Sequence, residues 1–237
     1  MSENIDTRVS LSLHPETVKA LPDFDDDTAA VLMPTVTAFD TAYQAVIAVH
    51  DARKAGASNP TWNENQVIIE TDNLARRKLE QVTRSFDAVR GNLLKGIAHI
   101  EAELTAPMNA KAAASVSSEI RAFVRDMETE KRHSFIQEAV DNGDEITVSS
   151  CLGAPAYLSG LTADFQQTYV RLWREKAAPD MAKRLRAMQG AVTLIEQNAP
   201  IVFNQMTDAV KAPPAKAKRL REAKTAAEKH FVMSDAA

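Results

Sequence analysis

The chain has little of several residue types, and each shortage excludes something. Of its 237 residues, only seven are glycine and one is cysteine, and aromatic residues make up 5%. A single cysteine, Cys151, cannot form a disulfide within the chain. Period-two runs of β-branched residues, the pattern of a half-buried strand, are almost absent. The many Ala, Glu, Lys, Arg, Gln and Leu residues are good helix formers, so the sequence predicts an all-α protein.

Long hydrophobic runs are missing as well. The first thirty residues lack the basic start and apolar core of a secretory signal, so we expect a cytoplasmic protein. The longest stretch without a charge, 146–163, contains two glycines, a proline and five serine or threonine residues, which makes it a poor membrane span. We therefore expect no transmembrane helix and no membrane partner.

Two long stripes of apolar residues dominate the sequence. The first lies in 63–104, where apolar residues recur at helical intervals from Ile68 to Leu104. As one helix, this segment would span about 60 Å at roughly 1.5 Å per residue. The second stripe runs from Phe165 to Val210 in steps of three and four. We expect the two stripes to pack lengthwise, in an elongated bundle of long antiparallel helices with coiled-coil-like packing.

Proline and capping residues set the predicted helix ends. Pro34 is expected to interrupt an early helix and to leave a secure helical segment at 35–55. Pro107 is expected to stop the long helix, and a third helix is predicted at 109–139. Thr162 is the predicted N-cap of the helix that carries the second stripe.

Charge is distributed unevenly along the chain, although the formal net charge is only −4. Residues 1–27 carry seven acids and two bases with few large apolar side chains, which predicts a weakly ordered arm. Residues 211–230 carry seven bases and two acids. The predicted organisation is an acidic arm at 1–27, an elongated helical bundle at 28–212, and a basic helix and tail at 213–237.

The basic end predicts either nucleic-acid binding or a docking surface for an acidic partner. Positive charge is the basis of sequence-independent nucleic-acid binding. However, no aromatic residue that could stack on a nucleobase lies between these lysines and arginines. Lysine and glutamate also recur four residues apart in this segment, as on an ordinary exposed helix. The candidate nucleic-acid-binding residues are Lys216, Lys218, Arg219, Arg221 and Lys224.

Two features could carry chemistry, and a structural interpretation competes with each. Glu130 and His133 have the Glu-x-x-His spacing of ferritin-like di-iron bundles, but no second copy supplies the remaining ligands. Cys151 has no base or cation beside it in the sequence, so it is either a nucleophile that His99 or His133 approaches in space or a buried structural cysteine. We expect no catalytic residue, no metal site and no cofactor, and a metal-dependent helical-bundle enzyme remains an alternative.

The uncharged stretch 146–163 is longer than a connection between two helices needs. Its large apolar side chains after Cys151 are Leu152, Tyr157, Leu158 and Leu161. Either these four side chains are buried as a plug at the end of the bundle, or they bind a partner. Helix stripes or loop packing account for Trp62, Tyr157, Trp173 and the phenylalanines, which are therefore assigned to the core.

The segment 141–162, with the sequence DNGDEITVSSCLGAPAYLSGLT, resembles segments of uncharacterised helical proteins encoded by tailed phages and prophages. The resemblance implies a virion or assembly context. With the long stripes, it predicts a non-enzymatic helical assembly protein that acts through self-association or partner binding, in the cytoplasm or in a virion. A nucleic-acid-associated protein that uses the basic end is the alternative.

Overall fold

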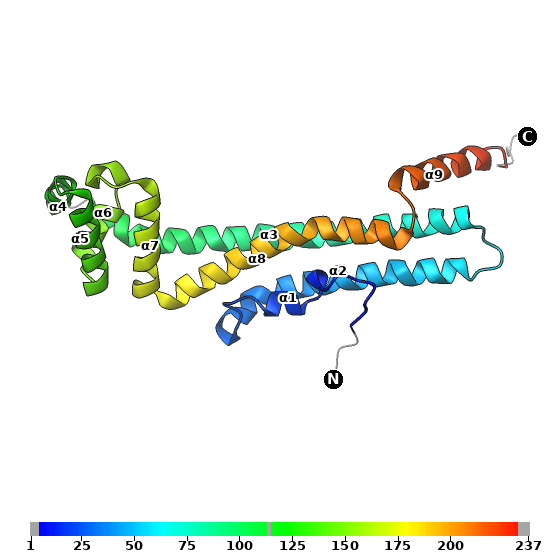
Figure 1. The fold of residues 1–237 in the computed structure, drawn as a ribbon, viewed down its shortest axis with the longest axis horizontal. Helices are drawn as coiled ribbons and strands as arrows, with labels where there is room; N and C mark the ends of the chain where they lie inside the picture. The colour runs from blue at the N-terminus through cyan, green and yellow to red at the C-terminus, as the bar shows by residue number, and fades with distance from the viewer. Residues whose placement is uncertain (1–4, 113–114, 232–237) are drawn as a thin grey trace, which may run out of the picture. The chain divides into compact units, whose positions relative to one another are not determined.

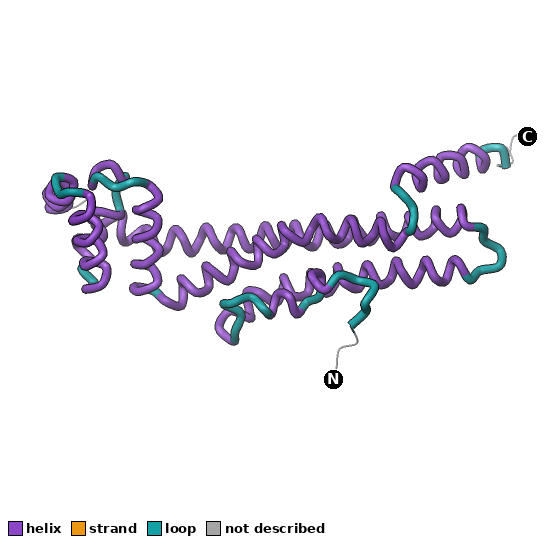
Figure 2. Tube along the Cα trace, in the orientation of Figure 1, coloured by secondary structure: helices purple, strands orange, loops and turns teal. Residues whose placement is uncertain are grey.

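The computed structural model describes residues 5–112 and 115–231 (Figure 1). These residues form helices and connecting turns, and no strand occurs among them (Figure 2). The all-α prediction is therefore confirmed. The chain divides into two compact units, the first made of residues 1–92 and 190–237 and the second of residues 93–189. The single bundle predicted for 28–212 is thus shared between the two units.

In the first unit, α2 (Asp26–Ala57) begins at a capping box. The Asp25 side chain accepts from the backbone of the first turn, and the Thr28 hydroxyl accepts from the Asp25 backbone N–H at 3.0 Å. The predicted interruption at Pro34 is wrong, because the helix continues through it. Pro34 removes the donor for the carbonyl of Ala30, and both residues are exposed, so water can satisfy that carbonyl.

Residues 5–25, predicted to be weakly ordered, fold against α2 instead. They contain the 3-10 helix η1 (Leu11–Leu13) and the short helix α1 (Glu16–Lys19), and both contact α2. The apolar side chains that this segment buries include Val9, Leu13 and Val18. A few well-placed apolar residues are enough to dock the segment, which its low overall apolar content did not indicate.

Three long helices form the core of the first unit: α2, the first part of α3 (Glu64–Ala112) and the last part of α8 (Pro179–Val210). The rings of Phe39 and Phe86 lie 5.3 Å apart between α2 and α3. Arg90 on α3 pairs with Glu196 on α8 at 2.6 Å. The most deeply buried side chains include Leu32, Phe39, Val46, Ile68, Val82 and Val202. Here the two predicted stripes do pack against each other.

The second unit departs from the predicted helix boundaries. The predicted stop at Pro107 is wrong, since α3 runs on to Ala112 with the proline at an exposed position. Of the single helix predicted at 109–139, residues 109–112 are the end of α3, and residues 115–139 are divided between two helices, α4 (Ser115–Arg125) and α5 (Thr129–Asn142). The break lies where the apolar stripe gives way to a polar run, so no buried face holds the helix together there.

The rest of the second unit is α6 (Glu145–Leu152), the 3-10 helix η2 (Ala156–Ser159) and α7 (Ala163–Ala177). Thr162 caps α7 as predicted, its hydroxyl accepting from the Phe165 N–H at 3.3 Å. The core residues of this unit include Met108, Val124, Ile136, Val140, Val148, Cys151, Leu152 and Leu161. None of the helices that the structure describes is long and apolar enough to cross a bilayer.

Candidate partner-binding surface

The guanidinium group of Arg132 organises one corner of the second unit, which we call the Arg132 corner. It donates to the backbone carbonyls of Val124 at 3.0 Å, Arg125 at 2.8 Å, Met127 at 2.7 Å and Gly160 at 2.5 Å. The carbonyls of Val124 and Arg125 lie in the last turn of α4, where a helix has its negative pole, and that of Met127 lies two residues beyond the helix. One cation from α5 therefore joins the end of α4 to the end of η2.

Gly160 is required at this corner for two reasons. Its φ of 68° lies in the left-handed region, which other residues adopt at a cost. A Cβ at this position would also lie 2.9 Å from the guanidinium carbon of Arg132. The glycine ends η2 and leaves room for the arginine that binds its carbonyl.

Two aromatic side chains next to the Arg132 corner face solvent. Phe123 lies in the last turn of α4, immediately before Val124, and Tyr157 lies in η2, three residues before Gly160. They are 60% and 72% exposed. The Phe123 ring meets the edge of Phe135 at 5.8 Å, which fixes its position without covering it.

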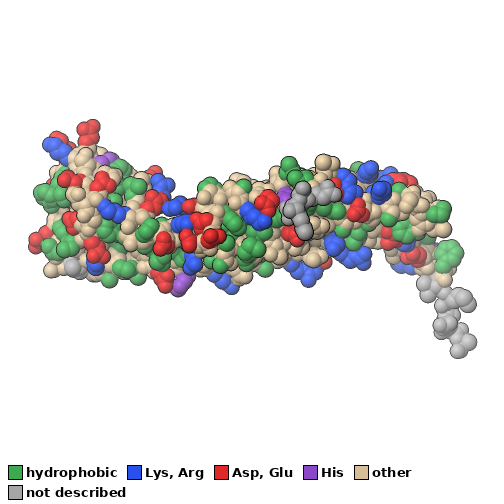
Figure 3. Space-filling view, turned by 90° about the horizontal axis from the view of Figure 1, so that it is seen from below, with side chains coloured by type: hydrophobic (Ala, Val, Ile, Leu, Met, Phe, Trp, Pro, Cys, Tyr) green, Lys and Arg blue, Asp and Glu red, His purple; other side chains and the backbone are tan. Residues whose placement is uncertain are grey.

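Two aliphatic side chains extend the exposed apolar surface of this unit. Val116, two turns before Phe123 on the same face of α4, is 46% exposed, and Ile146 on α6 is 61% exposed. Helix α6 contacts α4. On the face that Figure 3 draws, hydrophobic side chains are visible over the part of the molecule formed by α4 to α7. We call Val116, Phe123, Ile146 and Tyr157 the exposed apolar set.

The four loop residues predicted to act together are separated by the structure. Leu152 and Leu161 are buried in the core of the second unit, Leu158 is half-buried, and Tyr157 is exposed. The plug interpretation therefore fits the first two, and a partner could reach Tyr157 and part of Leu158. Assignment of Tyr157 to the core was wrong, and so was that of Trp62, which is 39% exposed.

Phe123 is a surface residue whose exposure the sequence pattern does not predict. It lies seven residues after Val116 and three after Ile120, so its spacing does not differ from that of a core residue. The side chain that α4 buries fully is its neighbour Val124. Only the packing of α4 against α6 and η2 shows which of the two faces inward.

Cys151 is buried beneath this surface, as its structural interpretation predicted. Burial raises the pKa of its thiol to about 11, so the thiol is protonated at neutral pH. The Ser159 hydroxyl donates to the Cys151 carbonyl at 3.2 Å, and the hydroxyls of Ser117 and Ser150 are 2.9 Å apart. These hydrogen bonds within the protein link α6 to α4 and to η2.

Glu130 and His133, the Glu-x-x-His pair, do not converge on a shared site. Glu130 is exposed, and the His133 ring stacks on Phe165 with the ring centres 3.4 Å apart. Burial, and then the charge of Arg132, lower the pKa of His133. Within residues 5–112 and 115–231, no group of three or more His, Cys, Asp or Glu side chains is arranged to hold a metal ion.

The predicted nucleic-acid-binding residues lie on α9 (Pro214–Glu228) in the first unit, and acids engage several of them. Arg221 pairs with Asp72 of α3, and Lys224 pairs with Glu70 of α3 at 2.9 Å. Lys218 lies 3.9 Å from Glu222. The hydrogen bond that Lys224 donates to Glu70 raises the pKa of Lys224. The remaining two candidate bases, Lys216 and Arg219, are exposed.

Comparisons of the chain with protein-family models, with curated proteins and with solved structures find no match. The likeness of residues 141–162 to phage proteins stays a prediction. Function is therefore inferred from the geometry of this chain, above all from the aromatic side chains beside the Arg132 corner.

Proposed function

We propose that this chain is a non-enzymatic assembly protein that binds a protein partner through the exposed apolar set of the second unit, with Phe123 and Tyr157 as anchors. The observation that carries the proposal is the exposure of two aromatic side chains, 60% and 72%, on backbone that Arg132 holds in place. Aromatic residues are over-represented among the side chains that dominate binding energy. Backbone that is already ordered lowers the entropy cost of association.

The energetics set a minimum size for the partner surface. Covering the exposed parts of Phe123 and Tyr157 would remove roughly 250 Å² from water, since an aromatic side chain buries about 150–250 Å² when fully covered. At about 25 cal/mol per Å², this contributes about 6 kcal/mol. A micromolar complex needs about 8 kcal/mol after the costs of association are met. A stable partner must therefore also cover Val116 and Ile146.

The partner can be a second copy of the chain or another protein, and a phage assembly context is part of this proposal. The likeness of residues 141–162 to tailed-phage proteins supports that context, because the segment contains Tyr157 and Ile146. Self-association would give a mass that depends on concentration, whereas a different partner would appear as a second component of the native complex. Sedimentation of the purified chain and mass measurement of the native complex separate these cases.

The test replaces the two anchors together, with Phe123→Ser and Tyr157→Ser in one chain. We expect the native complex to be lost while the melting temperature stays within about 2 °C of the parent, because neither ring is part of the core. The control replaces Asp87, an exposed polar residue of the first unit, by Ser, and should leave the complex intact. A double variant that assembles as well as the parent contradicts the proposal.

Nucleic-acid binding through α9 remains the second candidate and has less support. Acids already face Lys218, Arg221 and Lys224, which leaves a smaller positive field than the sequence suggests. Binding to nucleic acid that weakens steeply with salt and disappears in a Lys216→Glu, Arg219→Glu variant would favour this candidate. Salt-independent binding, or none, would remove it.

A further inference from the structure

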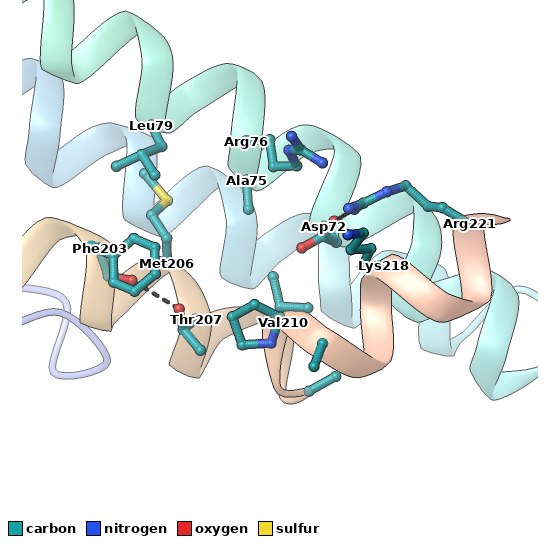
Figure 4. A pocket seen from close by; sticks show the side chains of 13 residues that line it. Asp72, Ala75, Arg76, Leu79, Phe203, Met206, Thr207, Val210, Lys218 and Arg221 are labelled. Carbon is teal, nitrogen blue, oxygen red and sulfur yellow. Dashed lines mark hydrogen bonds and ion pairs between the residues drawn. The ribbon is translucent and has the colours of Figure 1, made fainter.

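A pocket of about 360 Å³ opens in the first unit, where α3, α8 and α9 meet (Figure 4). Most of its wall is apolar. The wall includes Ala75 and Leu79 from α3, Phe203, Met206 and Val210 from α8, and Pro214 from α9. Its volume falls within the range of about 300–1,000 Å³ that is typical of small-molecule sites.

The chain makes this pocket by bending sharply after α8. Lys211 has a φ of 56°, in the left-handed region, and Pro213 and Pro214 then start a new helix in another direction. The ion pairs of Arg221 and Lys224 with acids on α3 hold α9 in place, and Ala217 is fully buried beside them. Helix α9 therefore closes one side of the groove between α3 and α8 without filling it.

Positive charge collects at one end of the pocket. Figure 4 shows Arg76, Lys218 and the Asp72–Arg221 pair at one end, and Leu79, Phe203 and Met206 at the other. Asp72 already faces Arg221, so its charge is compensated within the protein. Arg76 is exposed, and Lys218 forms a long ion pair with Glu222, at 3.9 Å. An adjoining hollow is lined by four bases, Arg76, Lys218, Arg221 and Lys229, and by the acid Glu222.

We propose that this pocket binds a monomeric anionic amphiphile, a molecule with one medium-length hydrocarbon chain and a carboxylate or phosphate head group. The chain would lie against Leu79, Phe203 and Met206, where it leaves water. The head group would lie between Arg76 and Lys218, because a guanidinium group binds such anions with two parallel hydrogen bonds and an ammonium group adds charge. Charge at one end and apolar wall at the other match this class of molecule.

The pocket fits a small amphiphile better than a partner helix. A helix that docks in a groove needs an open length in which anchors three and four residues apart can follow one another. Here α9 closes the groove at the end where the bases lie. The exposed apolar set, on which the proposed function depends, belongs to the second unit, so either proposal can fail without the other.

The test is isothermal titration of the full chain with octanoate, decanoate and dodecanoate below their micelle concentrations, and with decyl maltoside as an uncharged amphiphile. We expect one molecule per chain and a dissociation constant that falls about fourfold for each added methylene until the chain fills the pocket. Decyl maltoside should bind at least about tenfold more weakly than decanoate, because it cannot use Arg76 and Lys218.

Two variants and one matched control locate the binding. Arg76→Glu should weaken decanoate binding about tenfold, and Leu79→Trp, which fills the apolar end, should weaken it by at least as much. Arg77→Glu is the control for the change of charge. Arg77 follows Arg76 in the chain and lines a neighbouring hollow but not the pocket. This variant should therefore change the affinity for decanoate by less than about threefold.

Three outcomes would overturn the proposal. The first is unsaturable binding, or equal binding of the charged and uncharged amphiphiles. The second is unchanged affinity in both Arg76→Glu and Leu79→Trp. The third is absence of amphiphile binding; if Leu79→Trp then also dissociates a dimer, the pocket belongs to a second copy of the chain.

Discussion

Different kinds of interaction stabilise the interior of each of the two units. In the first unit, long helices bury apolar stripes against each other, and polar contacts such as Arg90–Glu196 lie partly exposed at the edges. In the second unit, short helices are joined by side chains that donate to backbone carbonyls. Arg132 binds four carbonyls, and Gln166 binds those of Leu152 and Ala154, both at 2.7 Å.

This difference shows which interactions of a helical protein a sequence pattern can predict. A stripe of apolar residues that recur every three or four positions is visible in the sequence and predicts packing between long helices. A side chain that reaches a carbonyl on another element leaves no periodic trace. Short helices also have a larger share of their backbone at unpaired ends, so they depend more on such contacts.

The largest expected effect tests the apolar stripe of the first unit. Phe86 is 3% exposed and contacts Phe39, so Phe86→Asp would remove ring packing and bury a charge without a partner. We expect the free energy of unfolding to fall by at least about 5 kcal/mol in urea titrations followed by circular dichroism. Ala88→Asp, on the exposed side of the same helix, should lower it by no more than about 1 kcal/mol, because Asp is a poorer helix former than Ala. Equal effects would show that the stripe does not face the core.

The next effect tests the carbonyl contacts of the second unit. Arg132→Ala removes the side-chain donor of four carbonyls, of which that of Val124 keeps the Met127 N–H at 3.3 Å. We expect a loss of about 3 kcal/mol, with faster amide hydrogen exchange in the second unit. Arg132→Lys should recover little, since an ammonium group cannot reproduce the planar fork of donors. Lys131→Ala, with its side chain 75% exposed, is the control and should be near neutral. A neutral Arg132→Ala variant would remove the contrast between the units.

Two glycine substitutions, one in each unit, give a further test of the difference between the units. Gly160→Ala should destabilise the protein by about 2 kcal/mol, because φ is positive and the new Cβ meets Arg132. Gly91→Ala, in the middle of α3, has nothing within 4 Å of the new Cβ and should stabilise by up to about 1 kcal/mol. Thermal unfolding of both variants measures the difference, and effects of the same sign would contradict this account.

The smallest effect concerns the buried thiol of Cys151. Its pKa is raised to about 11 in the folded chain from an unfolded value near 9.0, so the fold favours the protonated thiol. The stability that this contributes is present below pH 9 and is lost as pH rises toward 11. Between pH 8 and pH 10, the parent should lose about 1 kcal/mol more than a Cys151→Ala variant. If urea titrations give the parent and the Cys151→Ala variant the same dependence of stability on pH, the predicted contribution of the thiol is refuted.

Local signals accounted for the correct sequence predictions. The Thr162 cap, the exclusively helical secondary structure and the pairing of the two stripes in the first unit depend on residues that act over a few positions or repeat regularly. The errors came from tertiary context. Pro34 and Pro107 sit at exposed positions inside helices that packing stabilises, and η1 and α1 are ordered by α2 rather than by their own composition.

The sequence by itself determined that this chain is helical and where its apolar stripes lie, because both follow from the identity and spacing of neighbouring residues. Only the tertiary structure decided which surface residues are available. Lys224 meets Glu70, 154 residues away, and Arg221 meets Asp72, whereas Arg76 stays exposed. Phe123 faces solvent while the adjacent Val124 is buried. The free energy of a charge or a ring depends on what surrounds it in space, and residues far apart in the chain supply those surroundings.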